Sequence, residues 1–318
     1  MSTPNLLMIG DATDEMLSRL TTEFTIHRLD EIADLDLWAK EHGAVTEVVM
    51  TNGHHGIPPS VMAALPNLKA AAGYGVGYDA VDTDACVARG IKVSHTPNVL
   101  NGEVANTALL LLLAGMREFR RDEAWARSGD WEMQGNAPLT RSPDGKTIGI
   151  LGLGRIGQEI AKRLSIFDAK IVYHTRSKKD VPFDYYSNLV EMAADCDVLV
   201  CITPGGASTD KIVNREVLEA LGPEGMLINV SRGSVVDEAA LIAALDSGKL
   251  GCAGLDVFEG EPHIPNALKT SARTILLPHV GSATRETRAA MGALTVDNLL
   301  QWKADGTLIT PIPECAHL

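Results

Sequence analysis

The sequence has few cysteines and no long apolar run. Its five cysteines, at positions 86, 196, 201, 252 and 315, form no CxxC pair and are odd in number. A disulfide framework or a zinc site needs paired cysteines, so we expect reduced thiols and no bound metal. The longest apolar run is Ala108–Met116. A membrane-spanning helix needs about 20 apolar residues, which excludes a bilayer span.

Basic residues are also scarce. Lys and Arg number 28 against 41 Asp and Glu, which gives a net charge of −13. This balance argues against nucleic acid or an anionic membrane as the main partner, although it allows a local basic pocket for a small anion. The N-terminal segment lacks the basic residues that open a signal peptide. We therefore expect a cytoplasmic protein whose partner is a small molecule.

Short apolar segments and helical patterns alternate along the chain. A length of 318 residues, at roughly 150 residues per domain, suggests two domains. Strands separated by amphipathic helices are typical of βαβ units, so the pattern predicts the α/β class with parallel sheets. The expected strands are Leu6–Ile9, Val45–Thr51, Lys69–Ala72, Ile91–Ser94, Thr147–Leu151, Lys170–Tyr173, Val198–Ile202, Met226–Val230, Ala253–Val257 and Thr274–Leu277.

One long helical pattern separates the two series of strands. It runs from Val104 to about Arg127 and is followed by a Gly/Pro-rich polar segment, residues 129–145, which we expect to be a loop. The last 30 or so residues, from Arg285, predict another helix. The pattern alone does not assign that helix to either domain.

A glycine-rich turn follows the expected strand Thr147–Leu151. The turn has the form GxGxxG and leads into a helical pattern, which is the context in which such a turn binds a dinucleotide. The first glycine permits a tight turn, the second lets the backbone approach a pyrophosphate, and the third allows close packing of helix and strand. The N-terminus of the helix offers amides to the phosphates. The expected cofactor contacts are Gly152, Leu153, Gly154, Arg155, Ile156 and Gly157.

The next strand predicts which dinucleotide binds. NAD enzymes place an acidic residue near the end of this strand, where it hydrogen-bonds the adenosine ribose. Here Asp168 precedes the strand, Asp180 lies too far beyond it, and residues 174–179 read HTRSKK. Cationic donors suit a 2′-phosphate, which an acid would repel. The pattern therefore predicts NADP(H), with a solvated basic loop as the alternative. The expected contacts are His174, Thr175, Arg176 and Ser177.

Arg232, Glu261 and His279 each follow one of the later expected strands. The carboxyl ends of parallel strands lie at one edge of a sheet, so these side chains should converge there. Hydride addition to a 2-oxo acid needs a cation for the carboxylate or carbonyl and a proton donor for the developing alkoxide. An imidazole can donate near neutral pH, and a carboxylate on its other nitrogen fixes the tautomer. By spacing alone, Glu259 competes with Glu261 for that carboxylate role.

Five motifs, in their order and spacing, resemble the D-isomer-specific 2-hydroxyacid dehydrogenases, and among these the glyoxylate/hydroxypyruvate reductases. The motifs are YGVGYDAVD (74–82), GLGRIGQ (152–158), NVSRGSVVDEAAL (229–241), DVFEGEP (256–262) and LPHVGSAT (277–284). The resemblance implies two Rossmann-like domains with parallel sheets, the cofactor domain being inserted into the substrate-binding domain. It assigns residues 101–285 to the dinucleotide-binding domain and residues 1–100 plus 286–318 to the substrate-binding domain, and it implies a homodimer.

The resemblance also implies roles for single residues. Arg232 would bind the substrate carboxylate and carbonyl, and His279, paired with Glu261, would be the general acid in reduction. Asp256 would bind the nicotinamide carboxamide. Further cofactor contacts would be Ile202, Thr203, Pro204, Val230, Ser231, Asp256 and Gly281. Substrate contacts would be Gly75, Val76, Gly77, Leu100, Arg232 and His279.

The leading prediction is NADPH-dependent reduction of small 2-oxo acids, with glyoxylate and hydroxypyruvate as the best candidates. One alternative is a broader D-2-hydroxyacid dehydrogenase acting on phenylpyruvate-like or branched 2-oxo acids. Another is a non-catalytic module that senses NADP(H). None of these functions assigns a role to two further features. His54 and His55 suggest a metal pair, but a loop is the better interpretation, and Trp131 could be a core residue or reach a neighbouring subunit.

Overall fold

The computed structural model describes residues 3–318, which form two compact units. The first unit holds residues 3–100 and 284–318, and the second unit is Asn101–Ala283. The second unit is therefore an insertion into the chain of the first. This arrangement and the parallel α/β class confirm the predicted fold. The second boundary lies two residues earlier than expected, because Thr284 caps the last helix with its hydroxyl.

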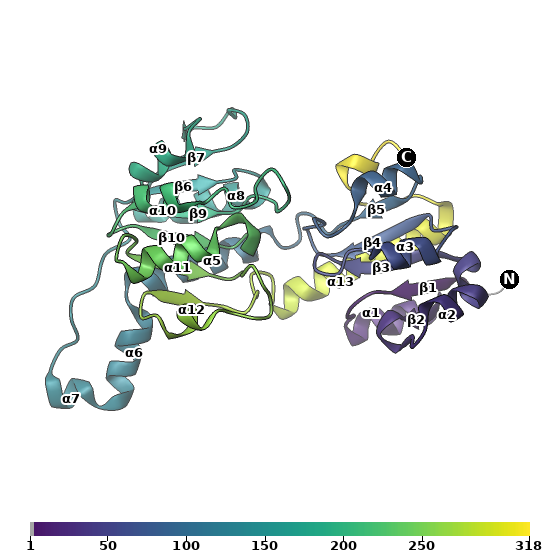
Figure 1. The fold of residues 1–318 in the computed structure, drawn as a ribbon, viewed down its shortest axis with the longest axis horizontal. Helices are drawn as coiled ribbons and strands as arrows, with labels where there is room; N and C mark the ends of the chain where they lie inside the picture. The colour runs from purple at the N-terminus through teal and green to yellow at the C-terminus, as the bar shows by residue number, and fades with distance from the viewer. Residues whose placement is uncertain (1–2) are drawn as a thin grey trace. The chain divides into compact units, whose positions relative to one another are not determined.

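The first unit is built on a five-stranded parallel sheet in the order β2-β1-β3-β4-β5 (Figure 1). Alternate residues of β1 face opposite sides: Leu6 and Met8 belong to one apolar cluster, Leu7 to the other. Both faces of the sheet are thus covered, as parallel sheets require. The strands are β1 (Asn5–Met8), β2 (Thr25–Arg28), β3 (Thr46–Asn52), β4 (Ala70–Tyr74) and β5 (Lys92–Ser94). The main helices are α1 (Asp14–Leu20), α2 (Leu35–His42), α3 (Pro59–Ala64), α4 (Thr83–Ala88) and α13 (Arg285–Asp305).

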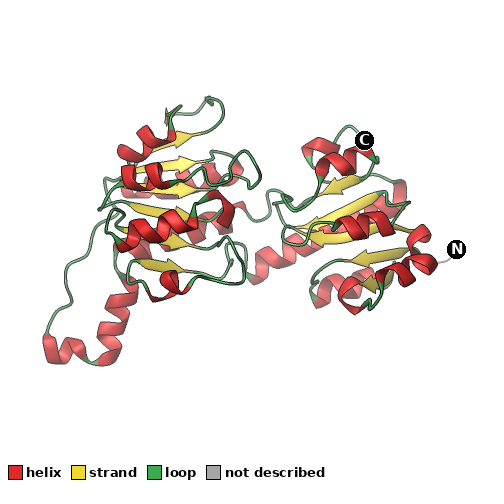
Figure 2. Ribbon diagram, viewed as in Figure 1, coloured by secondary structure: helices red, strands yellow, loops and turns green. Residues whose placement is uncertain are grey.

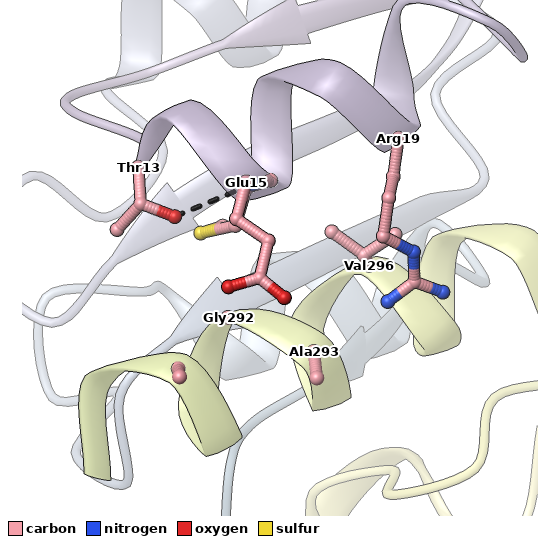
Figure 3. A pocket seen from close by; sticks show the side chains of 8 residues that line it. Thr13, Glu15, Arg19, Gly292, Ala293 and Val296 are labelled. Atoms are coloured by element: carbon pink, nitrogen blue, oxygen red, sulfur yellow. Dashed lines mark hydrogen bonds between the residues drawn. The ribbon is translucent and has the colours of Figure 1, made fainter. Parts of the chain in front are cut away.

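Helix α13 belongs to the first unit, where it packs against β4 and α1. Figure 3 shows the shallow crevice between α1 and α13, with small residues of α13 facing α1. A Cβ on Gly292 would lie 2.9 Å from the Met16 side chain, so the glycine permits this close approach. At the end of α1, Arg19 forms an ion pair with Asp297 at 2.6 Å. These contacts settle the assignment that the sequence pattern left open.

The second unit has a seven-stranded parallel sheet in the order β12-β11-β10-β9-β6-β7-β8 (Figure 2). The chain first runs outward from β6 through β7 to β8 and then returns to β9 on the other side of β6. The strand order therefore reverses between β6 and β9, and ligands of open parallel sheets bind at such a point. The strands are β6 (Thr147–Leu151), β7 (Lys170–His174), β8 (Asp184–Tyr185), β9 (Val198–Cys201), β10 (Met226–Asn229), β11 (Cys252–Leu255) and β12 (Thr274–Leu276).

The helices of this unit pack in two groups, α5 with α8 and α9 with α10 and α11. The strands β9 and β10 between them are buried at every position, which explains their unbroken apolar sequence. The helices are α5 (Asn101–Met116), α6 (Phe119–Ser128), α7 (Asp130–Gln134), α8 (Arg155–Leu164), α9 (Leu189–Ala194), α10 (Arg215–Leu221), α11 (Glu238–Asp246) and α12 (Asn266–Thr270). None of the helices in residues 3–318 has the length and apolar character needed to cross a bilayer.

All ten expected strands are present, with ends displaced by at most two residues. Three local expectations were wrong. The sequence pattern missed β2 and β8, which lie at sheet edges and carry little apolar signal. The single helix expected from Val104 to Arg127 is divided, because Glu118 adopts a left-handed conformation with φ +48°. The expected loop 129–145 begins with the short helix α7.

Candidate active site

The glycine-rich turn joins β6 to α8 and has the space that a dinucleotide needs. Gly152 has φ +101°, and a Cβ there would lie 2.8 Å from the amide nitrogen of Thr203. A Cβ on Gly157 would lie 2.2 Å from the Gly152 carbonyl oxygen. In contrast, a Cβ on Gly154 would meet no atom within 4 Å, so this exposed position at the start of α8 has room for a phosphate. The residues present fit a pyrophosphate at a helix N-terminus.

The loop after β9 lies beside this turn. The Ile202 amide donates to the Leu151 carbonyl at 2.9 Å, which continues the ladder between β6 and β9. Thr203 follows next to Gly152, and the Pro204 carbonyl accepts from the Thr209 hydroxyl at 2.7 Å. The three residues expected to contact the cofactor therefore stand at the reversal point of the sheet. Their contacts with the cofactor stay predictions.

The loop after β7 carries a group of exposed cations. Arg176, Lys178 and Lys179 are exposed, and none of them forms an ion pair within residues 3–318. His174 is half-buried, and its Nδ1 donates to the Tyr186 carbonyl at 2.9 Å, since a carbonyl can only accept. No acidic side chain occupies the end of β7. The local charge here is positive in a chain whose net charge is −13.

A buried asparagine shapes the turn that carries Arg232. Asn229 accepts from the Ser231 amide (3.1 Å) and hydroxyl (2.6 Å) and donates to the Arg232 carbonyl (2.9 Å). A Cβ on the next residue, Gly233, would lie 1.9 Å from the carbonyl carbon of Phe258. The glycine therefore lets the turn after β10 pack directly on the turn after β11. Both residues lie in the motif 229–241, but their structural roles were not expected, although an asparagine that ends an apolar strand is a visible signal.

Asp256 holds the segment that carries His279. Its carboxylate accepts from the amides of Val280 (2.7 Å) and Gly281 (2.8 Å), and its carbonyl accepts from the His279 amide (2.8 Å). A Cβ on Gly281 would lie 2.9 Å from that carboxylate. Burial raises the pKa of Asp256, and the two amide bonds act in the opposite direction. This structural role was not expected, and the contact with a nicotinamide carboxamide stays a prediction.

His279 and Glu261 form a hydrogen-bonded pair. The Nδ1 atom of His279 lies 2.7 Å from a Glu261 carboxylate oxygen, and the other oxygen accepts from the Phe258 amide at 2.9 Å. The competing residue Glu259 pairs with Lys211 at 3.2 Å instead. Because the carboxylate accepts at Nδ1, that nitrogen carries a proton and Nε2 is the nitrogen suited to exchange one with a substrate. The pair has the arrangement of an acid–base catalyst.

The expected substrate contacts Gly75, Val76, Gly77 and Leu100 belong to the first unit. The Gly75 carbonyl accepts from the Thr96 amide at 2.8 Å. The Val76 carbonyl accepts from Nδ1 of His95 at 3.0 Å, which fixes the peptide that joins Val76 to Gly77. The other three residues are half-buried, whereas Leu100 is buried.

The structure gives the position and exposure of the two features that the sequence left open. His54 and His55 lie exposed in the turn after β3, where Asn52 accepts from both of their backbone amides at 3.0 Å. Trp131 lies on α7 with 64% of its surface exposed, so its interpretation as a core residue is wrong.

Comparison with known proteins identifies this arrangement. The sequence model described as the NAD-binding domain of D-isomer-specific 2-hydroxyacid dehydrogenases matches residues 109–281. The chain belongs to this family. It is an oxidoreductase, and its second unit binds a nicotinamide dinucleotide. The resemblance stated from the sequence motifs is thereby confirmed.

This dehydrogenase is similar to several characterised relatives. A glyoxylate/hydroxypyruvate reductase of Arabidopsis thaliana is 40% identical over 98% of this chain and 100% of the relative. A 2-ketogluconate reductase of Gluconobacter oxydans is also 40% identical, over 98% of this chain and 99% of the relative. The crystal structure of an NADPH-dependent glyoxylate/hydroxypyruvate reductase of Sinorhizobium meliloti, in complex with NADP and malonate, is 46% identical with a TM-score of 0.93 and covers 99% of this chain and 98% of its own.

Proposed function

We propose that this dehydrogenase reduces small 2-oxo acids with NADPH, and that glyoxylate and hydroxypyruvate are its best substrates. The observation that carries the proposal is the 2.7 Å hydrogen bond between His279 and Glu261. His279 follows β12 and Glu261 follows β11, and the next strand in the sheet, β10, is followed by Arg232. A module that only binds the dinucleotide transfers no proton, so it does not need a histidine whose tautomer is fixed by a carboxylate.

Each polar residue has a definite task in this proposal. The dinucleotide supplies the hydride when bound. The Arg232 guanidinium binds the carboxylate of the 2-oxo acid and polarises its carbonyl, since a planar cation can form two parallel hydrogen bonds with a carboxylate. His279 donates the proton to the developing alkoxide from Nε2, and Glu261 stabilises the imidazolium that precedes this transfer. The first unit acts as the substrate-binding domain, with the Val76 and Gly77 amides as its contacts to the substrate.

The cofactor preference follows from the loop after β7. This loop carries three cations that form no ion pair with an acidic side chain in the described residues: Arg176, Lys178 and Lys179. A 2′-phosphate bound there would neutralise their positive charge. The Sinorhizobium relative, which was crystallised with NADP, supports the same choice. The test compares kcat/KM for NADPH and NADH with one 2-oxo acid at saturation. We expect a clear preference for NADPH, and a preference for NADH would contradict the proposal.

The substrate is tested with a panel of glyoxylate, hydroxypyruvate, pyruvate, phenylpyruvate and 2-oxoisovalerate. Higher kcat/KM for the first two supports the proposal. Higher values for the last two would favour a broader D-2-hydroxyacid dehydrogenase, an alternative suggested by a hydroxyphenylpyruvate reductase of Plectranthus scutellarioides that is also 40% identical. Tight NADPH binding with negligible turnover of every acid would favour the sensing module.

The proposal also includes a homodimer in the cytoplasm. Helices α6 and α7 extend away from the sheet of the second unit (Figure 1). They and the following segment expose large apolar side chains, which are unfavourable in water and mark contact surfaces. A second copy of the chain would cover them. The exposed residues are Phe119, Trp131, Met133 and Leu139.

A further inference from the structure

Two tyrosine hydroxyls hold the loop that follows β7. Tyr173 is fully buried, and its hydroxyl accepts from the Lys179 amide at 2.8 Å and donates to the Lys179 carbonyl at 3.2 Å. Tyr185, on the neighbouring strand β8, donates to the Thr175 carbonyl at 3.2 Å. The two rings contact each other, with centroids 5.4 Å apart. Both ends of the loop are therefore fixed by hydroxyls that come from the sheet.

A third hydrogen bond acts inside the loop. The Thr175 hydroxyl donates to the Ser177 carbonyl at 2.7 Å, and a hydroxyl has only one proton to donate. In this structure the proton of the Thr175 hydroxyl is therefore used within the loop, and the expected contact of Thr175 with the cofactor stays a prediction. In contrast, the side chains of Ser177 and Arg176 have no hydrogen-bond partner within residues 3–318.

These bonds determine which way the loop amides point. In a trans peptide the carbonyl and the following N–H point in opposite directions. The peptides after Thr175 and Ser177 are both trans. Since their carbonyls face the hydroxyls of Tyr185 and Thr175, the amides of Arg176 and Lys178 face the opposite way. Neither amide donates a backbone hydrogen bond in the described part of the chain. Backbone amides that have no protein acceptor can donate hydrogen bonds to a bound anion.

We propose that Tyr185 and Thr175 are positioning residues for the adenosine 2′-phosphate. Their hydroxyls turn the amides of Arg176 and Lys178 away from the loop's own hydrogen bonds before the cofactor binds. A loop ordered in advance loses less conformational freedom on binding, so the affinity gain is confined to ligands that carry the 2′-phosphate. This inference rests on the proposed NADPH preference.

The test measures binding of 2′,5′-ADP and 5′-AMP to the full chain by titration calorimetry. Tyr185→Phe and Thr175→Val each remove one proton donor and almost no volume. We expect the Kd for 2′,5′-ADP to rise about three- to tenfold in each variant, as for the loss of one neutral hydrogen bond, while the Kd for 5′-AMP is unchanged. Tyr186→Phe is the matched control. It removes the adjacent tyrosine hydroxyl, which donates to Asp195 at 2.8 Å outside the loop, and should alter neither Kd.

If Tyr185→Phe raises the Kd for 2′,5′-ADP and the Kd for 5′-AMP by the same factor, the hydroxyl has a general structural role and the inference is overturned. An unchanged Kd for 2′,5′-ADP would also overturn it. Arg176→Ala separates this failure from that of the proposed function. If Arg176→Ala weakens 2′,5′-ADP selectively and Tyr185→Phe does not, only the positioning role is wrong. If the unmodified chain binds 2′,5′-ADP no more tightly than 5′-AMP, the NADPH preference itself is wrong.

Discussion

The geometry of His279 depends on two carboxylates that act differently. Glu261 contacts the imidazole, whereas the Asp256 carboxylate accepts from the Val280 and Gly281 amides that follow His279. The backbone carbonyl of Asp256 accepts from the His279 amide. His279 has φ +53°, a conformation that costs a non-glycine residue free energy and persists only when its surroundings enforce it. The three hydrogen bonds to Asp256 supply that enforcement. Strain of this kind is concentrated at functional sites, which agrees with the role proposed for the imidazole.

Replacing His279 tests the proton transfer. We expect His279→Ala to lower kcat by about 10²–10⁴-fold, which is the usual contribution of a positioned general acid. Cofactor binding should be retained, because the imidazole does not shape the glycine-rich turn. The measurement is kcat with the best 2-oxo acid, with the Kd for NADPH as the control. Turnover like that of the unmodified enzyme would remove His279 from the mechanism.

Replacing Arg232 tests the substrate cation. Arg232→Ala removes charge-assisted hydrogen bonds that contribute about 1.5–3 kcal/mol, so KM for the 2-oxo acid should rise and kcat should fall. Arg232→Lys keeps the charge but loses the two parallel bonds, and should recover only part of kcat/KM. Steady-state kinetics with glyoxylate measures both variants. Unchanged kinetics in Arg232→Ala would mean that another cation holds the substrate.

At the scale of the elements, the site depends on strand ends that glycine allows to approach each other. The turn after β10 carries Arg232, and the turn after β11 carries Glu261. These turns meet at Gly233, where the Phe258 backbone fills the space that any side chain would occupy. The relative position of these two turns is therefore set by close packing of their backbones.

We expect Gly233→Ala to lower the free energy of unfolding by about 1–3 kcal/mol, the range for overpacking a filled site. This loss exceeds the gain of about 0.4–1 kcal/mol that Gly→Ala gives where the backbone is compatible. The measurement is chemical denaturation, together with kcat/KM of the folded variant, which should also fall.

Gly260→Ala is the control for this variant, because a Cβ at Gly260 in the same turn region would meet only the His263 carbonyl oxygen, at 3.7 Å. Its free energy of unfolding should not fall, and should rise by at most about 0.4–1 kcal/mol. Equal stability and activity in Gly233→Ala would show that the two turns can separate without consequence.

For the whole molecule, the exposed apolar side chains of α7 and the following segment predict self-association. Leu139 is 99% exposed and Met133 73% exposed. Covering such surface removes apolar area from water and so favours a dimer. Light scattering should give a mass twice the 33.9 kDa of one chain. The double variant Met133→Glu, Leu139→Glu should shift the mass toward that of one chain.

Ile166→Glu is the matched control for the dimer. This side chain is similarly exposed but lies in the short turn after α8 and is not one of the apolar residues of α6, α7 and the following segment, so its charge should not alter the mass. A mass of 33.9 kDa for the unmodified chain would contradict the proposed dimer.

The sequence by itself determined the α/β class, the ten main strands and the glycine-rich turn. These follow from short-range patterns, because buried parallel strands are apolar throughout and a tight turn needs glycine at fixed spacing. The same local information could not reveal β8, since two residues carry no periodicity, nor the division of the long helix at Glu118.

The tertiary structure decided three matters that residue spacing and periodicity could not. It paired His279 with Glu261 and left Glu259 to Lys211, a choice between two carboxylates that spacing could not make. It gave Asp256 the task of holding the His279 segment, and it placed α13 in the first unit. Each of these is a contact between residues distant in the chain. Such contacts depend on how the strands are ordered in the sheet, which a one-dimensional pattern does not encode.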